Sequence, residues 1–152
     1  MKNKAKDRGY FGIGIEYSKR ELNIGTLWRT AQTLGASFIF TIDKKYKKQT
    51  SDVRHAWADI PLYHYESFDE FYKAIPYDCQ LVGVEMDDEA KDLMTFNHPD
   101  RAIYLLGSES HGLSPEARKR CHHLVVLPGE HSLNVSVCGA VVLYDRLSKK
   151  GF

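Results

Sequence analysis

Short apolar runs alternate with amphipathic stretches along the chain, which is the pattern of an α/β protein. With helices between the strands, this pattern predicts a mostly parallel sheet that is covered by helices on both faces. A short helix is expected at residues 68–74, whereas residues 51–65 fit no element clearly. The predicted strands span residues 10–16, 37–42, 80–85, 102–106 and 123–128.

The first predicted helix begins at Asn23, which can cap its first turn, and ends at Gly35, a residue suited to the left-handed conformation of helix ends. Leu27 and Ala31 belong to its apolar face, so Arg29 falls on the polar face and points away from the core. An arginine in such a position is usually only solvated.

The predicted strand at residues 102–106 ends at Gly107 and is followed by a polar loop. A helix begins after this loop, because Ser114 can cap it, Pro115 suits its first position and Glu116 favours the positive end of its dipole. A strand, a glycine-bearing loop and a helix N-terminus are the parts from which α/β proteins build small-molecule sites.

The last apolar stretch, residues 133–147, alternates like a strand at first and then becomes continuous, so its periodicity does not decide between strand and helix. We interpret it as a helix capped by Ser132, because two lysines and Gly151 follow it and are typical of helix ends. Such a helix would be apolar nearly all round. It must therefore be buried against a sheet, a second subunit, or both.

The chain has 152 residues, of which 43% are apolar, and this suffices for one globular domain with its own core. We expect this domain at residues 9–152, after a basic, disordered tail at residues 1–8. The three cysteines are an odd number at unrelated spacings, so neither a disulfide framework nor a metal knuckle is indicated. No apolar stretch resembles a secretory signal or a membrane span, and a cytoplasmic protein is therefore expected.

The net charge of +1 gives no overall attraction to nucleic acid, but the basic residues are grouped. They form runs at residues 2–8, 44–48 and 118–120. Each run alone is typical of a solvated loop or tail, although clustered positive charge is also found on nucleic-acid-binding surfaces.

Several common kinds of site are missing from the sequence. None of the seven histidines forms a helical pair with a third ligand at a suitable spacing, so no metal site is expected. The G-x-S-x-G elbow of hydrolases and the Walker loop do not occur. Gly12 and Gly14 lie inside the first predicted strand and not after it, which argues against a dehydrogenase-like nucleotide fold.

Three segments, each modest alone, together resemble a known family. In order and spacing they are similar to the three motifs of the SpoU/TrmH family of RNA ribose 2′-O-methyltransferases, which belongs to the SPOUT class. The resemblance extends over residues 10–147. Its segments are Asn23-x5-Arg29-Thr30-Ala31, Gly107-Ser108-Glu109-Ser110-His111-Gly112-Leu113-Ser114 and Ser132-Leu133-Asn134-Val135-Ser136.

This resemblance implies a C-terminal trefoil knot, one of the rare exceptions to unknotted chains. It also implies S-adenosylmethionine bound in the knot and a homodimer formed through the last helix, with Arg29 of one chain facing the cofactor of the other. The residues that the resemblance assigns to the cofactor pocket are Val84, Gly107, Glu109, Gly112, Leu127, Ser132, Leu133 and Asn134.

The residues that the resemblance assigns to catalysis are Arg29, Asn23, Glu109 and Asn134. Methyl transfer to a ribose hydroxyl needs alignment and a proton acceptor but no metal ion. A guanidinium hardly ever loses its proton in a protein. Our hypothesis is therefore that Arg29 grips the phosphate beside the target ribose and orients the 2′-hydroxyl, while Asn23 and Glu109 complete the geometry.

The substrate is expected to be RNA, with tRNA favoured over rRNA because the added N-terminal RNA-binding domain of many rRNA enzymes is missing. A non-catalytic RNA-binding dimer of the same fold is the alternative. Trp57 departs from the family, whose members commonly carry small residues there. The expected phosphate contacts, which would make binding salt-dependent, are Arg8, Lys44, Lys45, Lys47, Lys48 and Arg54.

Overall fold

The computed structural model of the protein describes residues 9–43 and 60–151. The expected tail at residues 1–8, the basic run at residues 44–48, Arg54 and Trp57 lie outside this part of the chain. All six basic residues that the sequence predicts as general phosphate contacts are therefore outside the described residues, whereas Arg29 lies within them.

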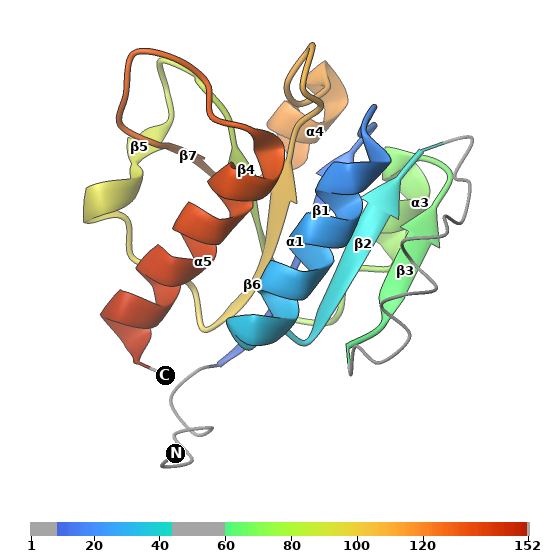
Figure 1. The fold of residues 1–152 in the computed structure, drawn as a ribbon, viewed down its shortest axis with the longest axis horizontal. Coiled ribbons are helices and arrows are strands. Elements are labelled where there is room, and N and C mark those ends of the chain that lie inside the picture. The colour runs from blue at the N-terminus through green and yellow to red at the C-terminus, as the bar shows by residue number, and fades with distance from the viewer. Residues whose placement is uncertain (1–8, 44–59, 152) are drawn as a thin grey trace.

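Seven strands form one sheet in the order β3-β2-β1-β6-β4-β7-β5, and neighbouring strands are parallel in every pair (Figure 1). The inner strands β1, β2, β4 and β6 are almost entirely buried, because both faces of the sheet are covered there. Their bounds are β1 (Tyr10–Glu16), β2 (Phe38–Ile42), β3 (Leu62–Tyr65), β4 (Gln80–Val84), β5 (Lys91–Asp92), β6 (Arg101–Leu106) and β7 (His123–Val126).

Helices cover both faces of the sheet, as the sequence predicts. On one face, α1 (Glu21–Thr33) and α5 (Val135–Lys150) lie side by side, and the other face carries α3 (Phe68–Lys73) and α4 (Pro115–Arg120) (Figure 1). The core is accordingly divided by the sheet into two clusters of buried side chains. Gly139 allows α5 to come close to its neighbours, because a Cβ there would lie 2.6 Å from Leu27 Cδ1 of α1.

The predicted helix boundaries are correct at some ends and wrong at others. Ser114 caps α4 by accepting a hydrogen bond from Ala117 N, and α1 stops before Gly35, whose φ is 88°. However, α1 starts before Asn23 and has Arg20 at its N-cap. The N-cap of α5 is Asn134 and not Ser132, because the Asn134 side chain accepts hydrogen bonds from the backbone of the first helical turn.

Between β4 and β6 the expected helix is wrong. The chain forms the short edge strand β5 and one turn of 3-10 helix, η1 (Leu93–Thr95). Strands β3 and β5 lie at the two edges of the sheet, where each pairs with only one neighbour. Neither of them is predicted from the sequence. Within residues 9–43 and 60–151, no helix has the length and apolar character required to cross a lipid bilayer.

Candidate functional site

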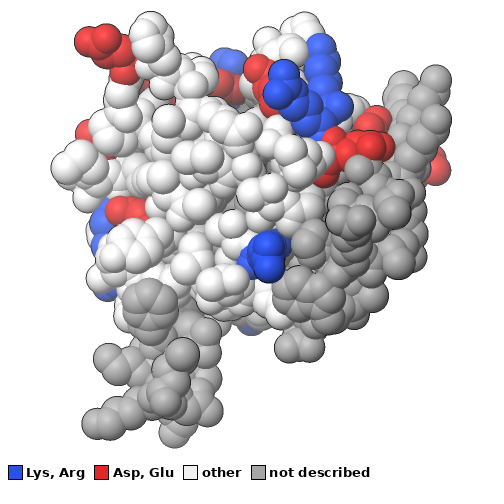
Figure 2. Space-filling model, viewed as in Figure 1, with Lys and Arg blue, Asp and Glu red and all other residues white. Residues whose placement is uncertain are grey.

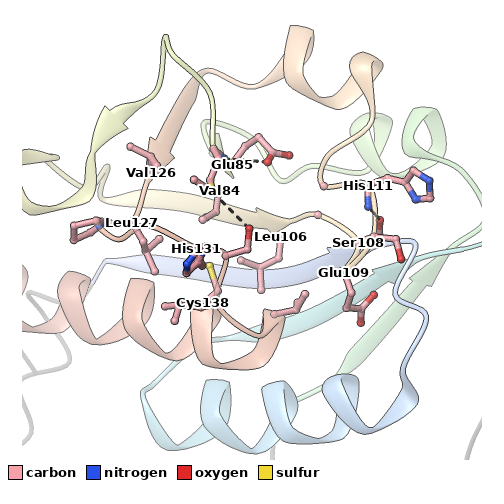
Figure 3. Close-up of a pocket in the computed structure, with 18 residues that line it drawn as sticks. Val84, Glu85, Leu106, Ser108, Glu109, His111, Val126, Leu127, His131 and Cys138 are labelled. Carbon is pink, nitrogen blue, oxygen red and sulfur yellow. Dashed lines mark hydrogen bonds between the residues drawn. The ribbon is translucent and has the colours of Figure 1, made fainter.

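A cavity of about 310 Å³ opens where β4, β6 and β7 end and α5 begins (Figure 3). This volume is within the usual range of small-molecule sites, roughly 300–1,000 Å³. Its apolar walls come from the ends of the three strands and from the first turns of α5, whereas its polar groups come from the loops. The lining residues are Val84, Glu85, Met86, Leu106, Gly107, Ser108, Glu109, Ser110, His111, Gly112, Val126, Leu127, Pro128, His131, Ser132, Leu133, Val135 and Cys138.

One wall of the cavity is the loop at residues 107–112, which we name the glycine loop. Ser108 and Gly112 exchange two backbone hydrogen bonds, of 3.1 and 3.0 Å, and Ser108 Oγ accepts a third from His111 N. Gly112 has a φ of 67°, a conformation that favours glycine. These bonds make a compact turn that carries Glu109 at the rim of the cavity.

Glu109 is joined to the start of α1 through both of its carboxylate oxygens. Oε1 accepts hydrogen bonds from Asn23 Nδ2 at 2.8 Å and from Ser18 Oγ at 3.0 Å, and Oε2 accepts one from Lys19 N at 3.0 Å. Partial burial opposes ionisation of Glu109, but these hydrogen bonds outweigh burial and lower its pKa. Glu109 is therefore an ionised and well-held carboxylate at neutral pH.

Asn23 extends the same chain of hydrogen bonds to α5. Its side-chain oxygen accepts a bond of 3.2 Å from Asn134 Nδ2, while the oxygen of Asn134 accepts bonds from Ser136 N, Ser136 Oγ and Val137 N. Asn23 is 4% exposed, so it is a buried polar group whose amide is satisfied at both ends. The link Glu109–Asn23–Asn134 joins the three sequence segments that carry the resemblance.

The described residues carry little positive charge at this cavity. Glu85 and Glu109 are its acidic lining residues, and no lysine or arginine lines it. Among the described residues, no group of three or more His, Cys, Asp or Glu side chains is placed to hold a metal ion. The cavity therefore suits a ligand that has an apolar body and carries positive charge.

A family model confirms what the three segments indicate. The model of the SpoU rRNA Methylase family matches residues 13–144. The chain belongs to this SpoU family.

Relatives and solved structures share this SpoU domain. The 23S rRNA (guanosine-2′-O-)-methyltransferase RlmB of Neisseria meningitidis is 27% identical over 131 residues, which are 81% of this chain and 52% of that protein. The chain thus spans about half the length of this relative.

Solved structures of low identity share the fold. The SpoU methyltransferase AviRb of Streptomyces viridochromogenes, solved in complex with AdoMet, has a TM-score of 0.85 at 22% identity, over 95% of this chain and 60% of that one. A structure described as giving insights into 2-OH methylation of C/U34 on tRNA has a TM-score of 0.81 at 23% identity, and covers 93% of this chain and 97% of its own. At this level of identity the likeness establishes the fold alone.

The structure brings most of the predicted SpoU site residues together. All those assigned to the cofactor pocket line the cavity except Asn134, which lies beside it at the start of α5. The side chains of Val84, Leu106 and Leu127 point into the cavity (Figure 3). Arg29 does not line the cavity of its own chain; it lies on the exposed side of α1, as its position in the sequence predicts.

Several residues at the site were missed. Glu85, Met86 and His131 line the cavity, and Glu16 holds the loop beside it through Ser114. The two glutamates could have been found from the sequence. Glu16 is the last residue of an apolar strand and Glu85 directly follows one, and α/β proteins place polar functional groups at such strand ends.

Proposed function

We propose that the protein is an S-adenosylmethionine-dependent RNA ribose 2′-O-methyltransferase and that tRNA is its preferred substrate. The observation that carries this proposal is the link Glu109–Asn23–Asn134, which unites the three family motifs at the rim of one cavity. The names of the relatives, which include both rRNA and tRNA enzymes, support the 2′-hydroxyl as the acceptor. The preference for tRNA is supported by the structure described as giving insights into 2-OH methylation of C/U34 on tRNA, which matches this chain over 97% of its own length.

The residues of the cavity fit S-adenosylmethionine. Val84, Leu106 and Leu127 offer apolar contacts for an aromatic base, and Ser132 and Leu133 also line the cavity. No lysine or arginine among the described residues lines the cavity, so none of them would oppose the ammonium and sulfonium charges of this molecule. When bound, it would supply the electrophilic methyl group.

The chain's own residues would orient the acceptor. Glu109 has a lowered pKa and is therefore a weak proton acceptor, so we assign it to holding Asn23 and not to taking the hydroxyl proton, which would pass to solvent water. Arg29 grips a phosphate next to the target ribose with its planar fork of donors and so orients the 2′-hydroxyl. Asn134 fixes the other end of Asn23.

A homodimer through α5 is part of this proposal. Val137, Val141 and Tyr144 share one face of the helix and are 47%, 38% and 60% exposed, and Leu133 just before the helix is 48% exposed. Uncharged side chains also cover most of the described surface over α1 and α5 (Figure 2). An exposed apolar stripe of this kind is typical of an interface between subunits, and a partner seated on it would present its Arg29 to the cavity.

The C-terminal trefoil knot and a cytoplasmic location complete the proposal. The similarity in fold to SpoU structures over nearly the whole chain supports the knot. Three free cysteines, Cys79, Cys121 and Cys138, support a reducing compartment.

Transfer of labelled methyl groups from S-adenosylmethionine to tRNA and rRNA tests the proposal. We expect transfer to a ribose of tRNA, a much weaker reaction of Arg29→Lys at saturating RNA, and an unchanged reaction of the control Lys73→Arg on the distant helix α3. Full activity of Arg29→Lys would exclude the bidentate role of this residue. RNA binding without any methyl transfer would leave the non-catalytic RNA-binding dimer as the correct reading.

A further inference from the structure

Two carboxylates from neighbouring strands hold the end of the glycine loop from both sides. Strand β6, which leads into the loop, lies between β1 and β4 in the sheet. Leu106 of β6 is in register with Ile15 of β1 and with Val84 of β4. The next residues of the flanking strands, Glu16 and Glu85, are therefore level with the first residue of the loop. Because side chains alternate along a strand, both glutamates point to the face that carries α4.

The strand-end carboxylates, as we name Glu16 and Glu85, accept hydrogen bonds from successive residues of the turn. Glu85 Oε2 accepts from Leu113 N at 2.6 Å. Glu16 Oε1 accepts from Ser114 N at 2.7 Å, and its Oε2 accepts from Ser114 Oγ at 2.8 Å. Two consecutive peptide N–H groups are thus bound by two carboxylates from opposite sides.

Burial makes these contacts specific. Glu16 is 0% exposed, and a buried carboxylate is costly unless each oxygen has a hydrogen-bond partner. Glu85 is 13% exposed and has a counter-ion in Arg118, at 3.3 Å. Its second oxygen accepts from Met86 N at 3.0 Å. There is also no space for a larger residue at the turn, since a Cβ on Gly112 would lie 2.2 Å from Glu85 Oε2.

We propose that Glu16 and Glu85 are positioning residues of the methyl-transfer site, because they fix the turn at residues 112–114 and with it the shape of the glycine loop. This proposal rests on the proposed function. Neither glutamate needs to touch the reacting atoms. Through the turn, they set where the backbone of residues 107–112 faces the cofactor and where Glu109 meets Asn23.

The two glutamates differ in how they respond to replacement by glutamine. Both oxygens of Glu85 accept from peptide N–H groups, so Glu85→Gln must direct an amide NH₂ against an N–H donor. One partner of Glu16 is the Ser114 hydroxyl, which can rotate and accept instead of donating. We therefore expect Glu85→Gln to disturb the turn and Glu16→Gln to preserve most of it.

The first measurement is titration of the variants with S-adenosylhomocysteine, together with separate KM and kcat values for S-adenosylmethionine and RNA. We expect Glu85→Gln to weaken binding and raise the KM for S-adenosylmethionine about ten- to a hundredfold, as for loss of a buried charged hydrogen bond. The KM for RNA should change little. The control is Glu116→Gln, which removes an exposed carboxylate on α4 and should behave like wild type.

Amide exchange of Leu113 and Ser114, followed by NMR, tests the turn without any ligand. Both amides should exchange slowly in wild type, and Leu113 should exchange faster in Glu85→Gln. If Glu85→Gln does not fold, the exchange rates of wild type still test the proposal. In that case, a Leu113 amide that exchanges as fast as the amide of the exposed Ser110 would overturn it.

The two proposals fail in different ways. If wild type binds no S-adenosyl compound, the proposed function is wrong, while the exchange rates still decide whether the carboxylates fix the turn. If wild type binds S-adenosylhomocysteine and Glu85→Gln binds it equally well, the positioning role is wrong. A lower Tm with unchanged affinity would also overturn it, because that result describes a purely structural role.

Discussion

Asn23 Nδ2 donates a hydrogen bond of 2.8 Å to Glu109 Oε1, although 86 positions separate the two residues in the chain. The bond connects the first turn of α1 to the glycine loop. Because Asn23 is buried and Glu109 is ionised, the bond is of the charge-assisted kind, which is stronger than a bond between neutral groups. It ties the first family motif to the second.

Replacing Asn23 by alanine should separate these two motifs. Loss of a buried, charge-assisted bond costs about 1.5–3 kcal/mol, so we expect methyl transfer to fall by roughly ten- to a hundredfold. Steady-state kinetics with RNA and S-adenosylmethionine measure this effect. Thr26→Ala on the exposed side of the same helix is the control, and equal activity of the two variants would contradict the role of Asn23.

The lowered pKa of Glu109 predicts how its contribution depends on pH. A carboxylate whose pKa falls on folding stabilises the fold above its ordinary pKa of 4.5, and this contribution disappears as the pH falls through the folded value. The free energy of unfolding, measured by thermal unfolding, should therefore differ between wild type and Glu109→Gln by a constant amount from neutral pH down to 4.5. The difference should shrink only in more acidic buffer. A difference that already vanishes at pH 6 would contradict the hydrogen bonds described here.

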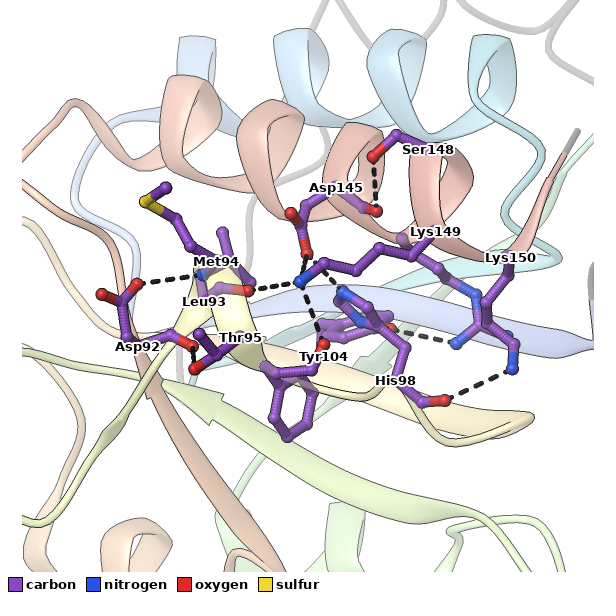
Figure 4. A network of polar contacts seen from close by, with 12 residues as sticks. Asp92, Leu93, Met94, Thr95, His98, Tyr104, Asp145, Ser148, Lys149 and Lys150 are labelled. Carbon is purple, nitrogen blue, oxygen red and sulfur yellow. Dashed lines mark hydrogen bonds and ion pairs between the residues drawn. The ribbon is translucent and has the colours of Figure 1, made fainter.

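A second polar network fixes the other end of α5, far from the cavity (Figure 4). His98 is buried between Tyr104 of β6 and Asp145 of α5, with both ring nitrogens at 2.7 Å from their partners. Lys149 binds the same Asp145 carboxylate and the carbonyl oxygens of Leu93 and Phe96. The network therefore attaches the segment around η1 to the last helix.

His98 should make the protein less stable in mildly acidic solution. Burial lowers its pKa and outweighs the favourable Asp145 carboxylate, while Arg146 and Lys149 lower it further. A histidine with a lowered pKa stabilises the fold fully above its ordinary value of 6.5, and this contribution is lost as the pH falls below that value.

The measurement is the free energy of unfolding between pH 8 and pH 5. We expect its decline below pH 6.5 to be smaller in His98→Gln, because glutamine can donate to Asp145 and accept from Tyr104 without titrating. The exposed His111→Gln should keep the wild-type decline. Identical profiles of wild type and His98→Gln would show that another group titrates.

A charge on the exposed stripe of α5 should dissociate the proposed dimer. Val141 is 38% exposed in the single chain, so Val141→Asp leaves the core intact but would place an unpaired carboxylate in an apolar interface. Sedimentation should give a dimer for wild type and a folded monomer for the variant. The monomer should have lost methyl transfer, because Arg29 would no longer reach the partner's cavity. A fully active monomer would contradict the shared site.

The parallel sheet, the two helix layers and the cap at Ser114 could be predicted because they follow from local patterns. Other features depend on contacts between distant residues. Asn23 has the chemistry of a cap, yet its side-chain oxygen accepts from Asn134 and its nitrogen donates to Glu109, so a rule for local caps misplaced the start of α1. The position of Glu16 and Glu85 at the end of apolar strands is visible in the sequence, but the register of β1, β4 and β6, which places them on either side of one turn, is not.

The two walls of the cavity are held very unequally. The glycine loop is bonded to the start of α1 through Glu109, and Leu113, the residue that follows the loop, is bonded to the end of β4 through Glu85. The opposite wall consists of residues 127–133. In the described part of the chain, one side-chain hydrogen bond joins this wall to its surroundings, the weak contact of 3.5 Å from Ser132 Oγ to Met86 Sδ. We therefore expect small molecules to enter and leave past residues 127–133, so that this segment sets how long a spent cofactor delays the next turnover.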